Sequence, residues 1–207
     1  MTWPGPFAPS PPPWTNKIDP YRKAWIHTFT GRRYDLRNPN PEVLTVQDVA
    51  HALSLINRYT GHTRVPYNVA QHSVLAAFQV PAPLRPMALF HDGHESVVGD
   101  VASPIKVVLG DAWRAFEDLH ERPFRRRFGL PEEFPLAIKE VDVRLLATEE
   151  RDLLAPGEGT EEFRSDVADM AARLGVSCRP FSCKIQPWTS AESEDMFLRM
   201  ARMLGIS

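Results

Sequence analysis

The sequence has few of the features that mark secreted or membrane-spanning proteins. It contains two cysteines, Cys178 and Cys183, and their spacing is not the CxxC spacing of zinc or redox sites. No apolar run approaches the ~18 residues that a membrane helix requires, and the chain does not open with the basic, apolar and small-residue series of a signal peptide. We therefore expect a cytoplasmic protein with no membrane partner, whose cysteines have a structural or incidental role.

An excess of charge of one sign is also absent. Lys and Arg total 24 against 26 for Asp and Glu, a formal net charge of −2, which argues against a nucleic acid partner. The basic run RPFRRRFG, from Arg122, is short, and we interpret it as a solvated helix face. With 207 residues, of which 43% are hydrophobic, the chain is long enough for one sizeable core in a single domain.

Proline and glycine divide the chain into regions. Residues 1–20 are rich in proline, which favours an extended and loosely ordered segment, and residues 21–207 are predicted to form the single domain. Residues 25–36 carry β-branched and aromatic side chains on both sides of Thr30-Gly31, a pattern that predicts a short β-hairpin.

From Thr45 onward the pattern is helical almost to the end of the chain. Thr45 and Asp48 form an N-cap signature before a periodic apolar stretch. Further helices are predicted over residues 69–80, 84–95, 112–128, 137–154 and 191–204. The sequence therefore predicts an all-α bundle with a small β-hairpin near its N-terminus.

Four residues are of the kinds that bind divalent cations: His72, the adjacent pair His91 and Asp92, and Asp142. Imidazole nitrogen and carboxylate oxygen together suit a divalent transition metal such as Co²⁺, Mn²⁺, Zn²⁺ or Fe²⁺. The four residues fall on three predicted helices, and facing helices of a bundle commonly build a metal site. Taken singly, a histidine such as His72 is more often an ordinary hydrogen-bonded or surface residue, and Asp142 alone is compatible with a solvated helix face.

The sequence around these residues resembles the HD-domain phosphohydrolases. Within them it is most similar to the bacterial 5′-deoxynucleotidases and the related bacteriophage deoxynucleotide (dATP-type) triphosphohydrolases. The matching stretches are INRYTGH, NVAQHS, ALFHDGHE, VVGDVASPIK and KEVDVRLLATEERDLL. The order H…HD…D is common to HD domains, and the R-[WY], HDxxE and GDxxSPxK elements narrow the resemblance to the nucleotidase branch. It implies an HD-domain helical bundle.

The resemblance also implies roles for residues beside the metal. One catalytic divalent ion would be bound by His72, His91, Asp92 and Asp142. Glu95 matches the family's catalytic glutamate, and on a helix it would face the same pocket as His91 and Asp92, where it can deprotonate the attacking water. Asp100 matches a family aspartate near the sugar of the substrate and the metal-bound water, which makes it the second implied catalytic residue.

Four further residues are implied to bind the substrate. Arg58 matches a family arginine that approaches the phosphate, and its planar fork suits bidentate contact. Tyr59 stands where the 5′-deoxynucleotidases usually have Trp and offers a flat face to a nucleobase. His62, in the following loop, is placed to touch phosphate oxygens. Lys106 follows the pair Ser103-Pro104, which resembles an N-cap followed by proline, and can neutralise a polyphosphate.

The function that the resemblance implies is metal-dependent hydrolysis of deoxynucleoside 5′-phosphates at the α-phosphorus, in nucleotide-pool metabolism. A monophosphate would yield deoxynucleoside and phosphate, and a triphosphate such as dATP would yield deoxynucleoside and triphosphate. The sequence leaves both substrates open. The alternative is a non-catalytic HD protein that binds a nucleotide as a sensor or scaffold, but every expected catalytic position is filled. The resemblance further implies a homo-oligomer, either a dimer or an assembly of dimers.

Overall fold

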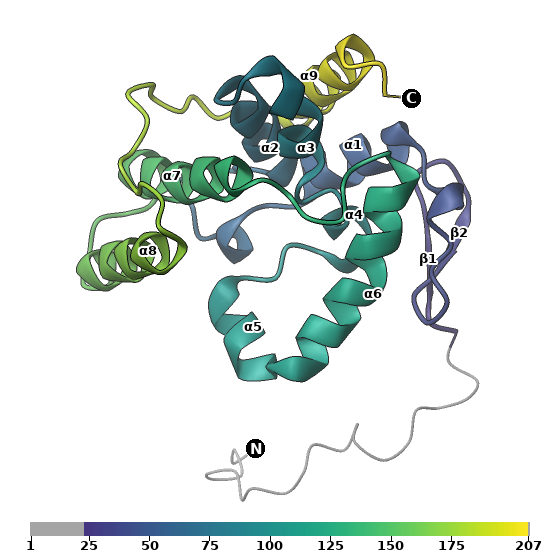
Figure 1. Ribbon diagram of the computed structural model, residues 1–207, viewed down its shortest axis with the longest axis horizontal. Coiled ribbons are helices and arrows are strands. Elements are labelled where there is room, and N and C mark those ends of the chain that lie inside the picture. The colour runs from purple at the N-terminus through teal and green to yellow at the C-terminus, as the bar shows by residue number, and fades with distance from the viewer. Residues whose placement is uncertain (1–22, 207) are drawn as a thin grey trace, which may run out of the picture.

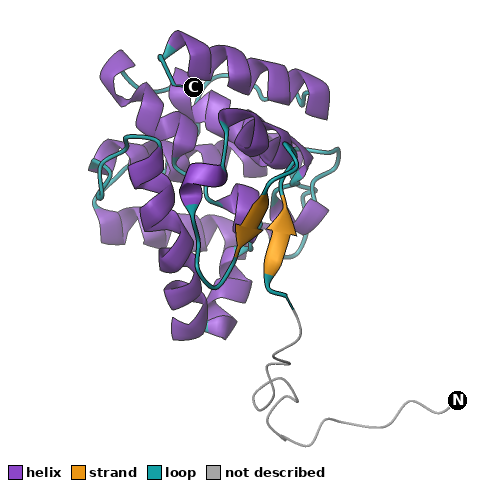
Figure 2. Ribbon diagram, turned by 90° about the vertical axis from the view of Figure 1, so that its right-hand side faces the viewer, coloured by secondary structure: helices purple, strands orange, loops and turns teal. Residues whose placement is uncertain are grey.

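The computed structural model describes residues 23–206, so the proline-rich stretch over residues 1–20 lies outside the described part. The described chain is mostly helical, with one two-stranded antiparallel sheet near its start (Figures 1 and 2). Strand β1, Trp25–His27, pairs with strand β2, Arg33–Asp35. Gly31, in the turn between them, has a φ of 83°, which glycine adopts without steric cost. The predicted helical class with a small hairpin is confirmed.

The helices cover most of the stretches in which the sequence predicts them (Figure 1). The five that match a prediction are α1 Val46–Leu55, α2 Val69–Phe78, α6 Asp111–Arg127, α7 Leu136–Leu153 and α9 Ser190–Met203. The others are α3 Arg85–Phe90, α4 Glu95–Val98, α5 Ser103–Leu109 and α8 Thr160–Leu174, with short 3₁₀ turns η2 Pro41–Val43, η3 Tyr59–Gly61 and η4 Ala82–Leu84. The predicted cap of α1 is present, because Thr45 and Asp48 each accept a hydrogen bond from the other's backbone N–H.

Three local predictions were wrong. The helix expected over residues 84–95 is interrupted, because α3 ends at Phe90 and a turn over residues 91–94, containing the poor helix former Gly93, precedes α4. Ser103 is the first residue of α5 and not its N-cap, a position that Ala102 holds without a side-chain bond. Helix α8 was not predicted, although Phe163, Val167 and Ala171 recur every four residues and pack toward α7.

The core beside the interrupted turn is built from aromatic rings of three helices. Phe90 at the end of α3 packs on Phe128, the C-cap of α6, and on Phe197 of α9, with ring centroids 5.0 and 5.2 Å apart. Phe124, also on α6, is 1% exposed. The run RPFRRRFG is therefore not simply a solvated face, because its two phenylalanines are buried and each stabilises the fold by about 1.5–3 kcal/mol. These rings fix the end of α3, immediately before His91 and Asp92.

Gly93 packs so closely on the ring of Phe124 that any larger residue is expected to destabilise the fold. A Cβ at this position would overlap the Phe124 Cζ and Cε1 atoms. We expect Gly93→Ala to lower the free energy of unfolding by about 1–3 kcal/mol, the usual cost of overpacking, as measured by urea denaturation. Gly157→Ala is the matched control, since a Cβ there meets nothing within 4 Å. Equal unfolding midpoints for the two variants would contradict the packing argument.

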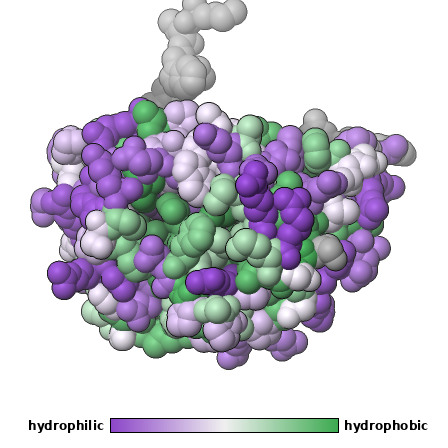
Figure 3. All heavy atoms as spheres, turned by 90° about the horizontal axis from the view of Figure 1, so that it is seen from above, coloured by the Kyte–Doolittle hydropathy of each residue, from purple (hydrophilic) through white to green (hydrophobic). Residues whose placement is uncertain are grey.

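The outer surface mixes apolar and polar groups. Seen from above, the middle of one face is largely apolar and its sides are hydrophilic (Figure 3). On α5, Val107 and Val108 are 80% and 85% exposed.

Within residues 23–206, no helix is both long enough and apolar enough to cross a membrane. Helix α5 packs mainly against α6, and Lys106 is the residue that it presents to the cavity described below.

Candidate metal centre and adjoining cavity

The four predicted metal ligands converge from three parts of the fold. His72 lies on α2, His91 and Asp92 lie in the turn after α3, and Asp142 lies on α7. His72 Nε2 is 3.2 Å from His91 Nε2 and 3.3 Å from Asp142 Oδ1. Asp92 Oδ2 is 3.1 Å from His91 Nε2. The structure thus brings together residues up to 70 positions apart in the sequence, from His72 to Asp142.

The spacing of these atoms fits a divalent cation. Ligand atoms about 2.1 Å from an ion stand roughly 3.0 Å apart in neighbouring octahedral positions and roughly 3.4 Å apart in tetrahedral ones. The three shortest separations, 3.1 to 3.3 Å, fall in that range. One ligand atom from each of His72, His91 and Asp142 lies within 4.8 Å of the other two. This buried group can therefore hold a metal ion.

Glu149 is a buried residue of the site that sequence reasoning missed. Its Oε1 accepts hydrogen bonds from His72 Nδ1 at 2.6 Å and from the Tyr67 hydroxyl at 2.9 Å. Its Oε2 accepts bonds from Arg58 Nε and Nη2, at 3.2 and 3.1 Å, and from the Tyr59 hydroxyl at 2.7 Å. Burial raises the pKa of Glu149, but the opposing effect of Arg58, His72 and these hydrogen bonds is larger, so that the net pKa is about 2. The seven-residue spacing from Asp142, close to two turns of one helix face, was the signal that could have found it.

His72 lies between carboxylates on both sides of its ring. Burial and Arg58 lower its pKa, whereas Glu149 on Nδ1 and Asp142 on Nε2 raise it, with the net result that the pKa of His72 is about 9. Carboxylates that favour a proton on Nε2 also favour a metal cation beside it, and binding of the metal would release that proton. The local field therefore suits a cation at this point.

Arg58 and Tyr59 are held beside the cluster by an uncommon backbone conformation. Tyr59 and Thr60 have φ values of 57° and 53°, in the left-handed region that residues other than glycine rarely adopt. Arg58 Nη1 lies 3.7 Å from Asp92 Oδ2, beside the cluster. The Tyr59 ring lies 6.2 Å from the Phe163 ring of α8, between centroids. The hydroxyl of Tyr59 donates a hydrogen bond to Glu149. The predicted stacking role of the ring did not include this bond.

A polar cavity of about 160 Å³ opens beside the metal ligands. Its lining includes His91, Asp92 and Asp142 of the cluster together with His94, Glu95, Lys106, Glu117, Glu121, Arg125, Phe134, Ile138 and Lys139. Burial, Asp92 and Asp100 raise the pKa of Glu95 well above its ordinary value. Within residues 23–206, the buried Glu95 Oε2 has no hydrogen-bond partner. A buried carboxyl with a raised pKa and a free oxygen is suited to exchange a proton with a molecule in the cavity.

The far wall of the cavity pairs cations with glutamates of α6. Lys106 Nζ lies 2.6 Å from Glu117 Oε1, and His94 Nε2 lies 3.6 Å from the same oxygen. The His94 contact, followed by Lys106, lowers the pKa of Glu117 to about 2 in spite of burial. Arg125 likewise pairs with Glu121. Lys106 therefore lines the cavity, but it already has a carboxylate partner.

Two predicted site residues lie at the edge of this arrangement. Asp100 follows α4 and is half-buried. Burial and Asp92 raise its pKa and Arg58 lowers it, and the net result is a raised pKa. It is thus close enough to the cluster for these charges to act on it. His62 lies exposed at the end of η3, and it does not line the cavity.

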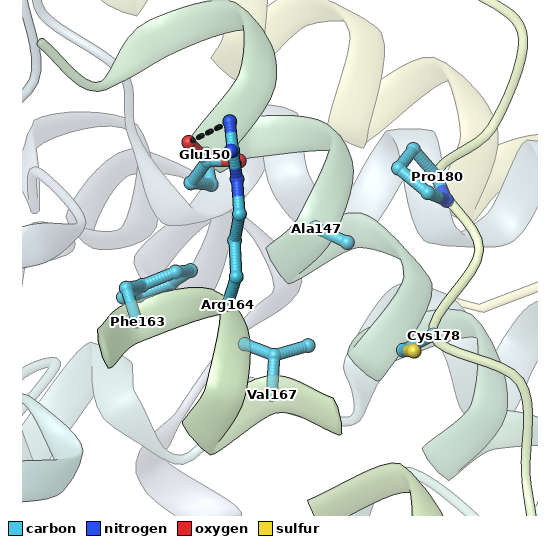
Figure 4. Close-up of a pocket in the computed structure, with 7 residues that line it drawn as sticks. All are labelled: Ala147, Glu150, Phe163, Arg164, Val167, Cys178 and Pro180. Carbon is cyan, nitrogen blue, oxygen red and sulfur yellow. Dashed lines mark hydrogen bonds and ion pairs between the residues drawn. The ribbon is translucent and has the colours of Figure 1, made fainter. Parts of the chain in front are cut away.

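A second cavity, of about 190 Å³, lies between α7 and α8 (Figure 4). Its lining is Ala147, Glu150, Phe163, Arg164, Val167, Cys178 and Pro180, and Figure 4 shows the Arg164 side chain reaching Glu150. None of the predicted site residues lines it. Helix α7 therefore has Asp142 and Glu149 on the side toward α2 and borders the second cavity on the side toward α8.

We expect a divalent metal ion to stabilise the wild-type protein against heat. At a metal concentration of 100 times Kd, binding adds about 2.7 kcal/mol, which corresponds to a rise in Tm of roughly 5–10 °C for a chain of this size. Asp142→Asn should remove most of the shift because it takes away one anionic ligand. Asp166→Asn, at an exposed position on α8, is the control. Scanning calorimetry with Mn²⁺ or Co²⁺ measures the effect, and an undiminished shift in Asp142→Asn would contradict the assigned ligand.

The fold and the cluster together define a mostly helical protein with a buried His/Asp group that can hold a metal ion. Over 130 residues the chain is 35% identical to the uncharacterized protein YfdR of Escherichia coli K12, covering 63% of this chain and 72% of YfdR. The chain belongs to the family of YfdR. It is also 35% identical over 127 residues to an uncharacterized protein of Rhodobacter capsulatus. This match covers 57% of this chain and 65% of the Rhodobacter protein. No family model matches the chain.

Proposed function

We propose that this protein is a metal-dependent phosphohydrolase of the HD type that hydrolyses a deoxynucleoside 5′-phosphate at the α-phosphorus. The observation that carries the proposal is the convergence of His72, His91, Asp92 and Asp142 beside a polar cavity that also contains Glu95. The H…HD…D order and the flanking INRYTGH and GDVASPIK elements resemble the nucleotidase branch of that superfamily and support the choice of substrate.

Each group in the site has a defined part in this chemistry. A divalent ion at the cluster would supply Lewis acidity toward a phosphoryl oxygen and make water acidic enough to attack at neutral pH. Glu95 orients that water and takes up a proton, because its Oε2 has no other partner within residues 23–206. Arg58 keeps Nη1 on the side of Asp92, where it can bind a phosphate oxygen. Attack at phosphorus breaks its bond to the 5′-oxygen, which takes up a proton, available from Glu95, and leaves as the neutral alcohol.

A deoxynucleoside triphosphate is the second candidate substrate. The cavity extends from the metal ligands to Lys106, Arg125 and Lys139, which is more positive charge than the phosphate of a monophosphate requires. Two of these cations are paired with Glu117 and Glu121, so phosphates of the substrate would have to compete with those carboxylates. The cations of the cavity wall therefore favour a triphosphate as substrate. The proposed contacts of the α-phosphate, with the metal and Arg58, are the same for both substrates.

Product identification tests the proposal. The protein is incubated with Mn²⁺ or Co²⁺ and with each deoxynucleoside mono- and triphosphate, and the products are resolved by ion-exchange chromatography and ³¹P NMR. Deoxynucleoside with phosphate, formed only from monophosphates, identifies a 5′-nucleotidase. Deoxynucleoside with triphosphate identifies a triphosphohydrolase. A metal-loaded protein that binds nucleotides and turns none of them over would refute the proposal and favour the sensor alternative.

A further inference from the structure

Glu149 is the most heavily engaged buried carboxylate of the site. Its side chain is fully buried, and it accepts five hydrogen bonds from four side chains. A carboxylate has about four lone-pair directions, so these donors leave no room for a further partner. The donors come from two regions, the segment over residues 58–67 and helix α2. One group on α7 thus fixes two separate parts of the chain.

On the side of the metal, Glu149 determines which nitrogen of His72 can bind a cation. Because the carboxylate accepts a hydrogen bond from Nδ1, the proton on Nδ1 is retained, and Nε2 is the nitrogen that gives up its proton and offers its lone pair when a metal binds. Nε2 is the atom that faces the cluster, 3.3 Å from Asp142 Oδ1 and 3.6 Å from Asp92 Oδ2. Carboxylates that bind the outer nitrogen of a ligating histidine fix its tautomer and ring orientation in this way.

On the side of the phosphate, Glu149 determines which edge of Arg58 is free. It occupies Nε and Nη2 of the guanidinium, so that Nη1 remains on the opposite edge, 3.7 Å from Asp92 Oδ2. The Arg58 side chain is only 9% exposed, and a long side chain held at both ends has little freedom to reorient. The Tyr59 hydroxyl binds the same oxygen, which further fixes the backbone that carries Arg58.

We propose that Glu149 is a positioning residue that joins the metal ligand His72 and the phosphate-binding Arg58 into one unit, so that metal affinity and phosphate affinity both depend on this single carboxylate. The phosphate half of this inference rests on the proposed function, whereas the metal half does not. A carboxylate that merely neutralised Arg58 would affect the stability of the fold and leave the metal affinity unchanged.

Glu149→Gln is the test variant, because it keeps the shape of the side chain while replacing one acceptor oxygen with a donor. We expect its affinity for Co²⁺ or Zn²⁺, measured by competition with a chromophoric chelator, to fall by about 10–100-fold. The affinity for inorganic phosphate, measured on the metal-loaded protein by calorimetry, should fall as well. Tyr67→Phe is the matched control: it removes one bond to the same carboxylate but keeps the charge and both key contacts, and its metal affinity should stay near that of the wild type.

Two further measurements separate positioning from stability. In Arg58→Met combined with Glu149→Gln, the buried charge is gone from both sides, so the fold should be more stable than in Arg58→Met alone while the metal affinity stays low. If the metal affinity also recovers, or if Glu149→Gln binds metal like the wild type, the inference is overturned.

Nitrogen-detected NMR of the zinc-loaded wild-type protein covers the case in which the variants do not fold. The inference requires the His72 proton on Nδ1 and the metal on Nε2, and the reverse assignment would overturn it. A wild-type protein that binds metal and hydrolyses no nucleotide would refute the proposed function, yet the chelator and NMR measurements would still decide the role of Glu149.

Discussion

Replacing Glu95 with glutamine is expected to lower kcat for nucleotide hydrolysis by about 10²–10⁴-fold, the usual contribution of a general acid or base. Glu95 is 5% exposed and faces the cavity, and its Oε2 has no partner within residues 23–206. Burial, Asp92 and Asp100 raise its pKa, which brings its proton exchange closer to neutral pH. Glutamine fills the same space but cannot exchange a proton, so metal affinity and stability should change little.

Steady-state kinetics on the substrate identified above, together with chelator competition for the metal, measure this prediction. Glu133→Gln, in the exposed loop before α7, is the control for loss of one surface carboxylate and should have the wild-type kcat. Two results would contradict the assignment. One is an unchanged kcat in Glu95→Gln. The other is a parallel loss of metal, which would make Glu95 a ligand and not a proton carrier.

Arg58→Met is expected to lower the free energy of unfolding by about 3–5 kcal/mol, the usual cost of removing one partner of a buried ion pair. The variant leaves the Glu149 carboxylate, which is 0% exposed, without the cation 3.1 Å away. Restoring neutrality by adding Glu149→Gln should recover part of that loss. Urea denaturation of the metal-free proteins measures both effects without any contribution from bound metal.

Arg164→Met is the matched control for this prediction. Arg164 forms an ion pair of the same length with Glu150, 3.1 Å, but its side chain is 54% exposed. Exposed pairs contribute only about 0–1 kcal/mol, so the control should differ little from the wild type. If the two variants lose equal stability, burial of the Arg58 pair does not have the energetic consequence inferred from the structure.

The group that can hold a metal ion was predictable because its residue types and chain order carry the information. His72, His91 and Asp142 could be singled out without knowing how the helices pack. Glu149 was harder to single out, because it stands in the charged stretch TEERD, where residue type alone does not show which of the two adjacent glutamates faces inward. Its spacing of two turns from Asp142 distinguishes it from Glu150, which lines the second cavity, toward α8.

Long-range packing accounts for the other differences between prediction and structure. The break after α3 places Gly93 against Phe124, which lies 31 residues further along the chain. The pairing of Lys106 with Glu117 depends on the turn between α5 and α6. Helix α8 was missed because its charged residues obscure a sparse apolar stripe. Periodicity predicts individual helices well, whereas such contacts depend on the arrangement of the helices in space.

The position of α7 late in the chain has a consequence for synthesis. The hydrogen bonds of Glu149 span 77 to 91 residues, and closing loops of this length costs entropy that is recovered only when the final contacts form. A nascent chain that ends within α6 already contains Arg58, His72 and His91, but it contains no counter-charge from α7. Such a chain lacks the carboxylate that binds both Arg58 and His72, and it must wait for translation of the next thirty or so residues. Docking of α7 is thus both a late folding step and the assembly of the site, and a transcript truncated before codon 142 yields neither.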